Sequence, residues 1–255
     1  MKARLVLAVA ALLGAVLPAT AQTAEQWIAR ARARLGSESA LQGVTSVHFV
    51  GTIEVTEKVP SETDKAVLVD RTVSRAMDVI FQKPMQQRFT FTSPELIEVL
   101  ALDDYDAWQK RTNPKNPTQW QLTLLDATQT KRLRAQAWDN LNFLRGIEKL
   151  RGSVTVGGDA TVDGLACVKL VFSYSDNIVL TRYYDKATAR LVKTETEAGV
   201  EIREEGEMFV NGIRFARKVS NREKSGRIVT LNFEQVVLNE TFPASDFAVP
   251  PLQAN

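Results

Sequence analysis

Apolar and polar positions follow two different periods along this chain, and a helical period lies between two blocks of strand period. Within Asp126–Gly152, apolar side chains recur every three or four residues, as on one face of an amphipathic helix. This stripe consists of Leu133, Ala137, Trp138, Leu141, Leu144 and Ile147. Asp126 with Gln129 predicts a capping box at the start, and Gly152 predicts the end. Gly146 costs about 1 kcal/mol relative to alanine, which leaves open a break into two shorter helices.

A second, shorter helix is predicted at Gln22–Leu41, near the start of the chain. Trp27, Ala31 and Leu35 follow one another there at intervals of four, and Gly36 is a predicted stop. We expect this helix to pack one face on a sheet.

From Val44 onward, and again after the central helix, the period changes to two, as in half-buried strands. The predicted strands are Val44–Thr56, Val67–Arg75, Met77–Lys83, Gln86–Thr92, Leu96–Leu102, Ala107–Lys110, Thr118–Leu124, Ser153–Val156, Leu165–Ser173, Ile178–Asp185, Leu191–Ala198, Glu201–Val210, Phe215–Glu223 and Arg227–Leu238. Asp163-Gly164 and Asn211-Gly212 are typical of hairpin turns. Because helices do not alternate with these strands, we expect an antiparallel sheet, and about eleven strands require strong curvature or closure. The predicted fold class is α+β, mainly β, an open barrel with the long helix in its mouth.

Residues 1–21 have the pattern of a secretory signal peptide. Two basic residues, Lys2 and Arg4, precede the apolar run Leu5–Leu17, and a small-residue cleavage site ends at Ala21. A signal anchor is the alternative, but the apolar run is shorter than the roughly 20 residues that span a bilayer. The cleavage region has no cysteine, so a lipid anchor is not expected. The sequence predicts a soluble protein exported to the periplasm.

Residues 22–255 are expected to form one domain, since no Pro-, Gly- or Ser-rich linker divides them. The chain has 32 Lys and Arg against 30 Asp and Glu, and the leader holds two of the basic residues, so the remainder carries no net charge. This balance argues against a nucleic-acid partner. Cys167 is the sole cysteine, which excludes an internal disulfide, and its strand-like surroundings predict a buried thiol.

Candidate catalytic residues are few. His48 is the only histidine, and no nucleophile motif lies near it, so we expect a surface-facing strand residue rather than a general base. Phosphate-binding loops, dinucleotide fingerprints and Gly-x-Ser-x-Gly or His-Glu-x-x-His motifs are absent from the sequence. Asp103, Asp104 and Asp106 could bind calcium, but their spacing is that of a hairpin turn and not of an EF-hand. We therefore expect no enzyme activity, no cofactor and no metal.

Three segments resemble the outer-membrane lipoprotein carrier (LolA/LolB-like) superfamily. Arg182–Leu191 is similar to its strand, aromatic-Asp-x-x-Thr-Gly-x-Leu, strand hairpin, with Ala189 where glycine is usual. Asn211–Val219 resembles its Gly-Ile-x-Phe-Pro step, with Ala216 in place of proline, and Phe242–Pro250 resembles its Asp-x-x-Phe-x-x-Pro tail. The resemblance is best over the last third of the chain, and the order of elements extends it to the first part.

The resemblance implies a half-barrel whose hydrophobic inner face is covered by helices that move to admit an acyl chain. In these carriers an arginine holds the lid shut, but none of the arginines here aligns with it, so no gating residue is transferred. Candidate lid and cavity residues are Trp108, Trp120, Leu133, Trp138, Leu141, Leu144 and Ile147. An ordinary filled core would need the same apolar pattern, and this alternative stays open for each residue.

Three functional classes follow. The first is a carrier or sensor that binds a lipid or lipoprotein acyl chain, with at most peripheral contact to a membrane. The second is a non-catalytic interaction domain with a filled barrel that binds another envelope protein. The third is an enzyme, which would need a polar constellation in the cavity that the sequence does not reveal.

Overall fold

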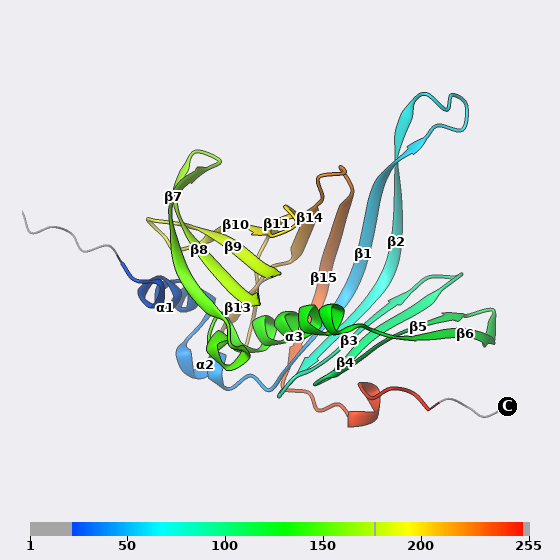
Figure 1. The fold of residues 1–255 in the computed structure, drawn as a ribbon, viewed down its shortest axis with the longest axis horizontal. Helices are drawn as coiled ribbons and strands as arrows, with labels where there is room; N and C mark the ends of the chain where they lie inside the picture. The colour runs from blue at the N-terminus through cyan, green and yellow to red at the C-terminus, as the bar shows by residue number, and fades with distance from the viewer. Residues whose placement is uncertain (1–21, 176, 252–255) are drawn as a thin grey trace, which may run out of the picture.

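The computed structural model describes residues 22–175 and 177–251, so the predicted signal peptide lies outside the described residues. Within these ranges the alternating segments build one curved antiparallel sheet of thirteen strands that stays open at both edges (Figure 1). The predicted mainly β fold is confirmed, with somewhat more strands than the eleven expected.

The strands of this sheet differ widely in length. They are β1 (Ser46–Pro60), β2 (Leu68–Gln82), β3 (Gln86–Thr92), β4 (Ile97–Asp103), β5 (Asp106–Asn113), β6 (Asn116–Leu124), β7 (Ser153–Val162), β8 (Leu165–Ser175), β9 (Ile178–Asp185), β10 (Leu191–Thr196), β11 (Glu201–Glu205), β14 (Lys218–Arg222) and β15 (Ile228–Leu238). A separate two-stranded ribbon consists of β12 (Met208–Val210) and β13 (Ile213–Phe215). The long β1–β2 hairpin extends beyond the rest of the sheet (Figure 1).

The two edge strands, β6 and β7, follow each other in the chain with α3 (Ala127–Asn142) between them. The order is β6-β5-β4-β3-β2-β1-β15-β14-β11-β10-β9-β8-β7, so the β1–β15 pair joins two halves of the sheet. The chain must therefore pass from one edge to the other, and α3 does so across the concave face (Figure 1). At about 1.5 Å per residue its 16 residues span about 24 Å.

The central helix starts where the sequence predicts but is shorter. The capping box of Asp126 and Gln129 is confirmed, because each side chain accepts a hydrogen bond from the other residue's backbone N–H. The helix ends at Asn142 and not at Gly152. The prediction of a single helix over Asp126–Gly152 is therefore wrong. The alternative of a break near Gly146 is the one that the structure shows.

A tight turn follows the end of α3. Phe143 and Leu144 take left-handed backbone conformations, with φ of 47° and 72°, and Gly146 takes a third with φ of 72°. Three left-handed residues reverse the chain, which a continuing α-helix cannot do. The short 3-10 helix η1 (Ile147–Leu150) then leads to β7.

The predicted N-terminal helix is divided in two, α1 (Ala24–Leu35) and α2 (Glu38–Gln42). At Gly36 a Cβ atom would lie 2.9 Å from the Gly212 carbonyl oxygen, so the absence of a side chain lets this corner approach the β12–β13 turn. Ser37 then caps α2 by accepting from the backbone N–H of Ala40 at 3.2 Å.

Two strand boundaries differ from the prediction. β2 is one long strand where two were expected, and the run Glu201–Val210 divides into β11 and β12 at Gly206, whose φ is 66°. The hairpin turns at Asp163-Gly164 and Asn211-Gly212 are confirmed, since all four residues have positive φ as a two-residue turn requires. The hairpin turn predicted at the aspartates is also confirmed. Asp103 ends β4, and Asp106 begins β5.

The buried side chains form two main clusters on the concave face. One lies over β1–β4 and receives Leu133, Ala137 and Leu141 from α3. The other lies over β8 and β9 and receives Trp27 and Ala31 from α1, with Ala135 of α3. α3 therefore packs on both halves of the sheet, and the space between the two clusters remains for a site.

Candidate ligand-binding site

A cavity of about 520 Å³ lies between the concave face of the sheet, α1 and α3. Ligand pockets in proteins commonly measure about 300–1,000 Å³ and are mostly apolar. Its lining extends from β9 to β3 and includes Phe49, Phe81, Phe89, Leu180, Leu231 and Phe233. This mostly apolar cavity beneath α1 and α3 is the chamber of the protein.

The period of two in β9 determines which of its side chains enter the chamber. Ile178, Leu180, Arg182 and Tyr184 all line the cavity, because alternate residues of a strand point to the same face. Tyr183, between them, lies on the other face, where its hydroxyl donates to Glu195 at 3.1 Å. The strand therefore places one cation and one phenol among apolar neighbours.

Arg182 forms a buried ion pair with α3. Arg182 is 5% exposed, and its Nη2 donates to Oδ2 of Asp139 on α3. The Tyr174 hydroxyl donates to the other carboxylate oxygen at 2.7 Å, and the guanidinium lies 4.5 Å from the centroid of the Phe172 ring. Burial, followed by the charge of Asp139, raises the pKa of Tyr174 well above its ordinary value, so this phenol stays protonated. The pair ties β9 to the last turn of α3, where Asp139 lies.

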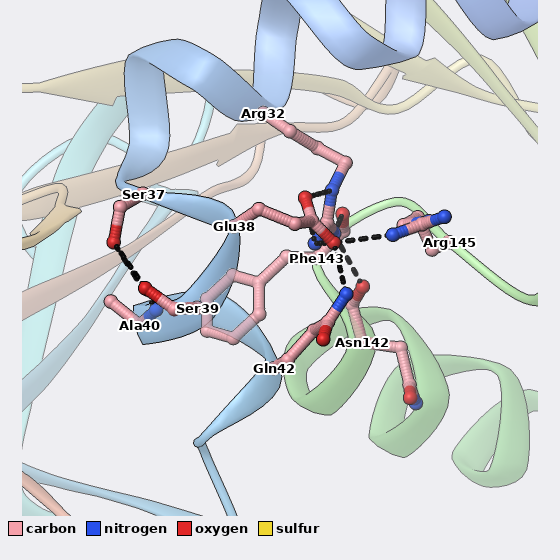
Figure 2. A network of polar contacts seen from close by, with 9 residues as sticks. All are labelled: Arg32, Ser37, Glu38, Ser39, Ala40, Gln42, Asn142, Phe143 and Arg145. Atoms are coloured by element: carbon pink, nitrogen blue, oxygen red, sulfur yellow. Dashed lines mark hydrogen bonds and ion pairs between the residues drawn. The ribbon is translucent and has the colours of Figure 1, made fainter.

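A second buried arginine holds the end of α3 (Figure 2). Arg32 of α1 is 4% exposed, and its Nη1 donates to the carbonyl of Asn142 at 2.9 Å and also to that of Phe143. Glu38 of α2 accepts from Nε and Nη2 of Arg32 at 3.1 and 2.9 Å, and Arg145 also donates to it. Two helices and the turn after α3 are joined by this network.

The predicted site residues lie around the chamber more than in it. Leu144 lines the cavity. Leu133 and Leu141 are buried in the cluster over β1–β4, Ile147 in the cluster over β8 and β9, and Trp138 packs against both. As ligand contacts these residues stay predictions, but Leu133, Trp138 and Leu141 form the packing face of α3, and Ile147 packs from η1.

The other two predicted residues are tryptophans of β5 and β6, outside the cavity lining. Trp108 is buried, and its indole N–H donates to the carbonyl of Phe247 at 2.8 Å. Trp120 is 39% exposed, with the ammonium of Lys110 5.2 Å from the centroid of its ring. As ligand residues the two tryptophans stay predictions. Neither belongs to the group of five predicted residues that lie on α3 or just after it.

Sequence reasoning missed the two arginines. Arg182 had a signal, since it occupies an inward position in an otherwise apolar alternation, where a charge needs a partner. Arg32 had none, because its acceptors are carbonyls more than a hundred residues away in the chain.

His48 lies on the outer face of the sheet, as predicted for a strand residue, but the C-terminal segment partly covers it. It lies on the side of β1 away from the cavity, with Nε2 2.8 Å from Asp78 and Nδ1 2.7 Å from Glu240. Desolvation lowers the pKa of the imidazole, but the two carboxylates outweigh it and raise the pKa above its ordinary value. This histidine ties the C-terminal segment to the sheet.

Comparisons with known proteins concern the fold. No protein-family model matches the chain, and no curated protein matches it. A structure described as an outer membrane lipoprotein-sorting protein domain, from Vibrio parahaemolyticus, is 13% identical, with 88% of this chain and 96% of that chain covered at a TM-score of 0.54. A LolA superfamily protein from Nitrosomonas europaea is 15% identical, with 90% and 99% covered at 0.56. A DUF1329 family protein from Desulfovibrio piger is 9% identical, with 88% and 96% covered at 0.56.

At 9–15% identity, these likenesses concern the class of fold alone. Within that class, the chain has a LolA-like fold, as its three sequence segments predicted. None of the three descriptions names an enzyme. Among residues 22–175 and 177–251, no helix is both long enough and apolar enough to cross a bilayer.

Proposed function

We propose that this protein is a non-catalytic carrier or sensor that binds the acyl chain of a lipid or lipoprotein in the chamber beneath α3. The observation that carries the proposal is the 520 Å³ cavity with its phenylalanine and leucine lining. Each methylene group that leaves water for such surroundings contributes about 0.8 kcal/mol. An acyl chain therefore gains most where a preformed apolar space is open to it.

The lid arrangement supports the same proposal. Arg182 contacts Asp139 in the last turn of α3 and Arg32 contacts the carbonyl at its end, and neither contact is part of the strand pairing. In this proposal the leader predicted at residues 1–21 directs the protein to the periplasm without a lipid anchor, where acyl chains need carriage through water. The alternative of an interaction domain with a filled barrel is disfavoured by the cavity volume.

Binding of a fluorescent fatty acid tests the proposal. We expect saturable micromolar affinity, and lipid in solvent extracts of the native protein. Leu180→Trp should fill part of the chamber and weaken binding about tenfold, since space for about two methylene groups is worth about 1.6 kcal/mol. Leu124→Trp is the matched control, because Leu124 is 67% exposed and lies outside the lining.

Two results would contradict the proposal. One is the absence of both probe binding and extractable lipid, and the other is an equal effect of the two tryptophan variants. Export is tested separately by the intact mass of the secreted protein, which should begin at Gln22 without a diacylglycerol.

A further inference from the structure

The wall of the chamber at β9 contains hydrogen-bond donors that the fold leaves unused. Nη1 of Arg182 and the hydroxyl of Tyr184 have no partner among the described residues. The two residues are 5% and 2% exposed, and both line the cavity. The two donor atoms are themselves buried, so an acceptor in the cavity reaches them with a shift of the side chains around them. An unmet buried donor costs about 1–3 kcal/mol, more when it is charged, so these groups favour an acceptor that enters the cavity.

The charged side chains that line the chamber are mostly cationic. Its lining includes Arg34, Arg132, Arg182, Arg190 and Arg214, against the carboxylates Asp139 and Glu204. Two of the arginines also pair with Glu197 and Glu207 outside the lining, which still leaves one positive charge in excess. Both oxygens of Asp139 are occupied, by Arg182 and by Tyr174. The surplus attracts an anion, and the unused donors give it a fixed position.

We propose that Arg182 and Tyr184 form a head-group subsite for the carboxylate of a fatty acid, whose chain runs along the chamber toward β1–β3. This inference rests on the proposed function and names its ligand class. Arg182 and Tyr184 lie two residues apart on one face of β9, where both can reach one planar carboxylate. The opposite end of the lining, with Phe49, Phe81 and Phe89, has apolar side chains for the tail.

The inference separates two kinds of acyl ligand. Esters and amides of fatty acids, as in lipidated proteins, offer a neutral carbonyl, whereas a free fatty acid offers a negative charge. A hydrogen bond to a charged group contributes about 1.5–3 kcal/mol, which corresponds to at least about a tenfold difference in affinity.

Displacement of a neutral pyrene-labelled hydrocarbon at about pH 8, where a carboxyl is ionised, provides the test. We expect hexadecanoate to bind about tenfold more tightly than hexadecanol and methyl hexadecanoate. Tyr184→Phe should remove much of that preference, measured as the ratio of the hexadecanoate affinity to the hexadecanol affinity. Tyr183→Phe is the matched control, since it deletes the same hydroxyl from the outer face of the same strand. Arg182→Lys keeps a cation beside Asp139 and should also reduce the preference.

Each other outcome overturns the inference in a distinct way. Equal binding of acid, alcohol and ester would remove the head-group subsite and leave the proposed function standing. Binding of none of them would remove both. Acetate or inorganic phosphate binding as tightly as hexadecanoate would indicate a small-anion site, and preference for hexadecyl phosphate would indicate a phosphate head. An undiminished preference in the folded Tyr184→Phe and Arg182→Lys variants would exclude these two residues.

Discussion

The two ends of α3 are fixed in different ways. At the N-terminal end the backbone N–H of Gln129 donates to Asp126 at 2.8 Å, and the N–H of Asp126 donates to the Gln129 side chain at 3.1 Å. All of these atoms lie within four consecutive residues. At the C-terminal end the carbonyls of Asn142 and Phe143 accept from Arg32, a residue of another helix (Figure 2).

The difference shows where the stability of the lid helix comes from. A helix leaves its last carbonyls unpaired, and a glycine just after the end commonly allows the chain to pair them locally. Here Phe143 occupies that position in a left-handed conformation, and buried Arg32 supplies the donors. The first end depends on its own sequence, whereas the second combines local bonds, such as that from the Arg145 N–H to the Asn142 carbonyl, with the donors that Arg32 of α1 supplies.

The largest effect is expected from Arg32→Met. This change leaves the carbonyl of Phe143 unpaired in a buried position and removes the donors to Glu38, so the free energy of unfolding should fall by about 2–4 kcal/mol. Urea denaturation measures it. Arg34→Met on the same helix is the control and should stay within about 0.5 kcal/mol, because Arg34 is exposed. Equal effects would mean that the C-terminal end of α3 does not need its distant partner.

Gly146→Ala tests the turn that follows that end. With φ of 72° an alanine costs about 1–2 kcal/mol, and its Cβ would lie 2.9 Å from the Trp138 ring, so the total should reach about 2–3 kcal/mol. Gly226→Ala isolates the backbone contribution, since Gly226 has φ of 86° with open space around it. If the two variants lost the same stability, the Trp138 contact would have no energetic role.

The same contrast explains how far the sequence predicts this molecule. The capping box, the hairpins at Asp163-Gly164 and Asn211-Gly212, and the curved antiparallel sheet follow from local residue preferences and periods, and the structure confirms them. Burial of Cys167 is likewise confirmed. Each of these features depends on residues that are neighbours in the chain or on a repeating pattern.

Features set by distant contacts were not predictable. The contact of Arg32 with the end of α3 joins distant segments, and the apolar stripe of the helix could not reveal whether it faces a ligand or packs against the sheet. Leu141 is fully buried in the core, whereas Leu144, just past the helix end, lines the cavity. They are three positions apart in sequence, and only the turn at Leu144 assigns them to different surroundings.

Asp126→Ala should have a smaller effect than either change at the other end. Loss of an N-cap side chain costs about 0.5–2 kcal/mol, and the amide of Gln129 becomes exposed to water without its acceptor. Gln129→Ala should cost less, because it removes one bond to the backbone of Asp126 and leaves the cap itself in place. Thermal or urea unfolding measures both. An unchanged midpoint for Asp126→Ala would mean that packing alone sets the start of the helix.

The smallest effect concerns pH and the C-terminal end. Partial burial raises the pKa of Glu38, but hydrogen bonds from Gln42 and Arg32, the charge of Arg32 and a bond from Arg145 outweigh it and place the pKa below its ordinary value of 4.5. A carboxyl with a lowered pKa in the folded state stabilises the protein above its unfolded pKa, and this stability is lost as the pH falls through the folded value.

Glu38→Gln tests this dependence. The unaltered protein should be more stable than the variant at about pH 7, by at most about 1 kcal/mol because the side chain is 48% exposed. The difference should disappear in the acid range, below the lowered pKa of Glu38, where the carboxyl is protonated. In an Arg32→Met background the pH-dependent difference should shrink, because the chief cation is gone. If the difference in the free energy of unfolding instead stayed constant with pH in both backgrounds, Glu38 would act only within α2, and its charge would not help to hold the end of α3.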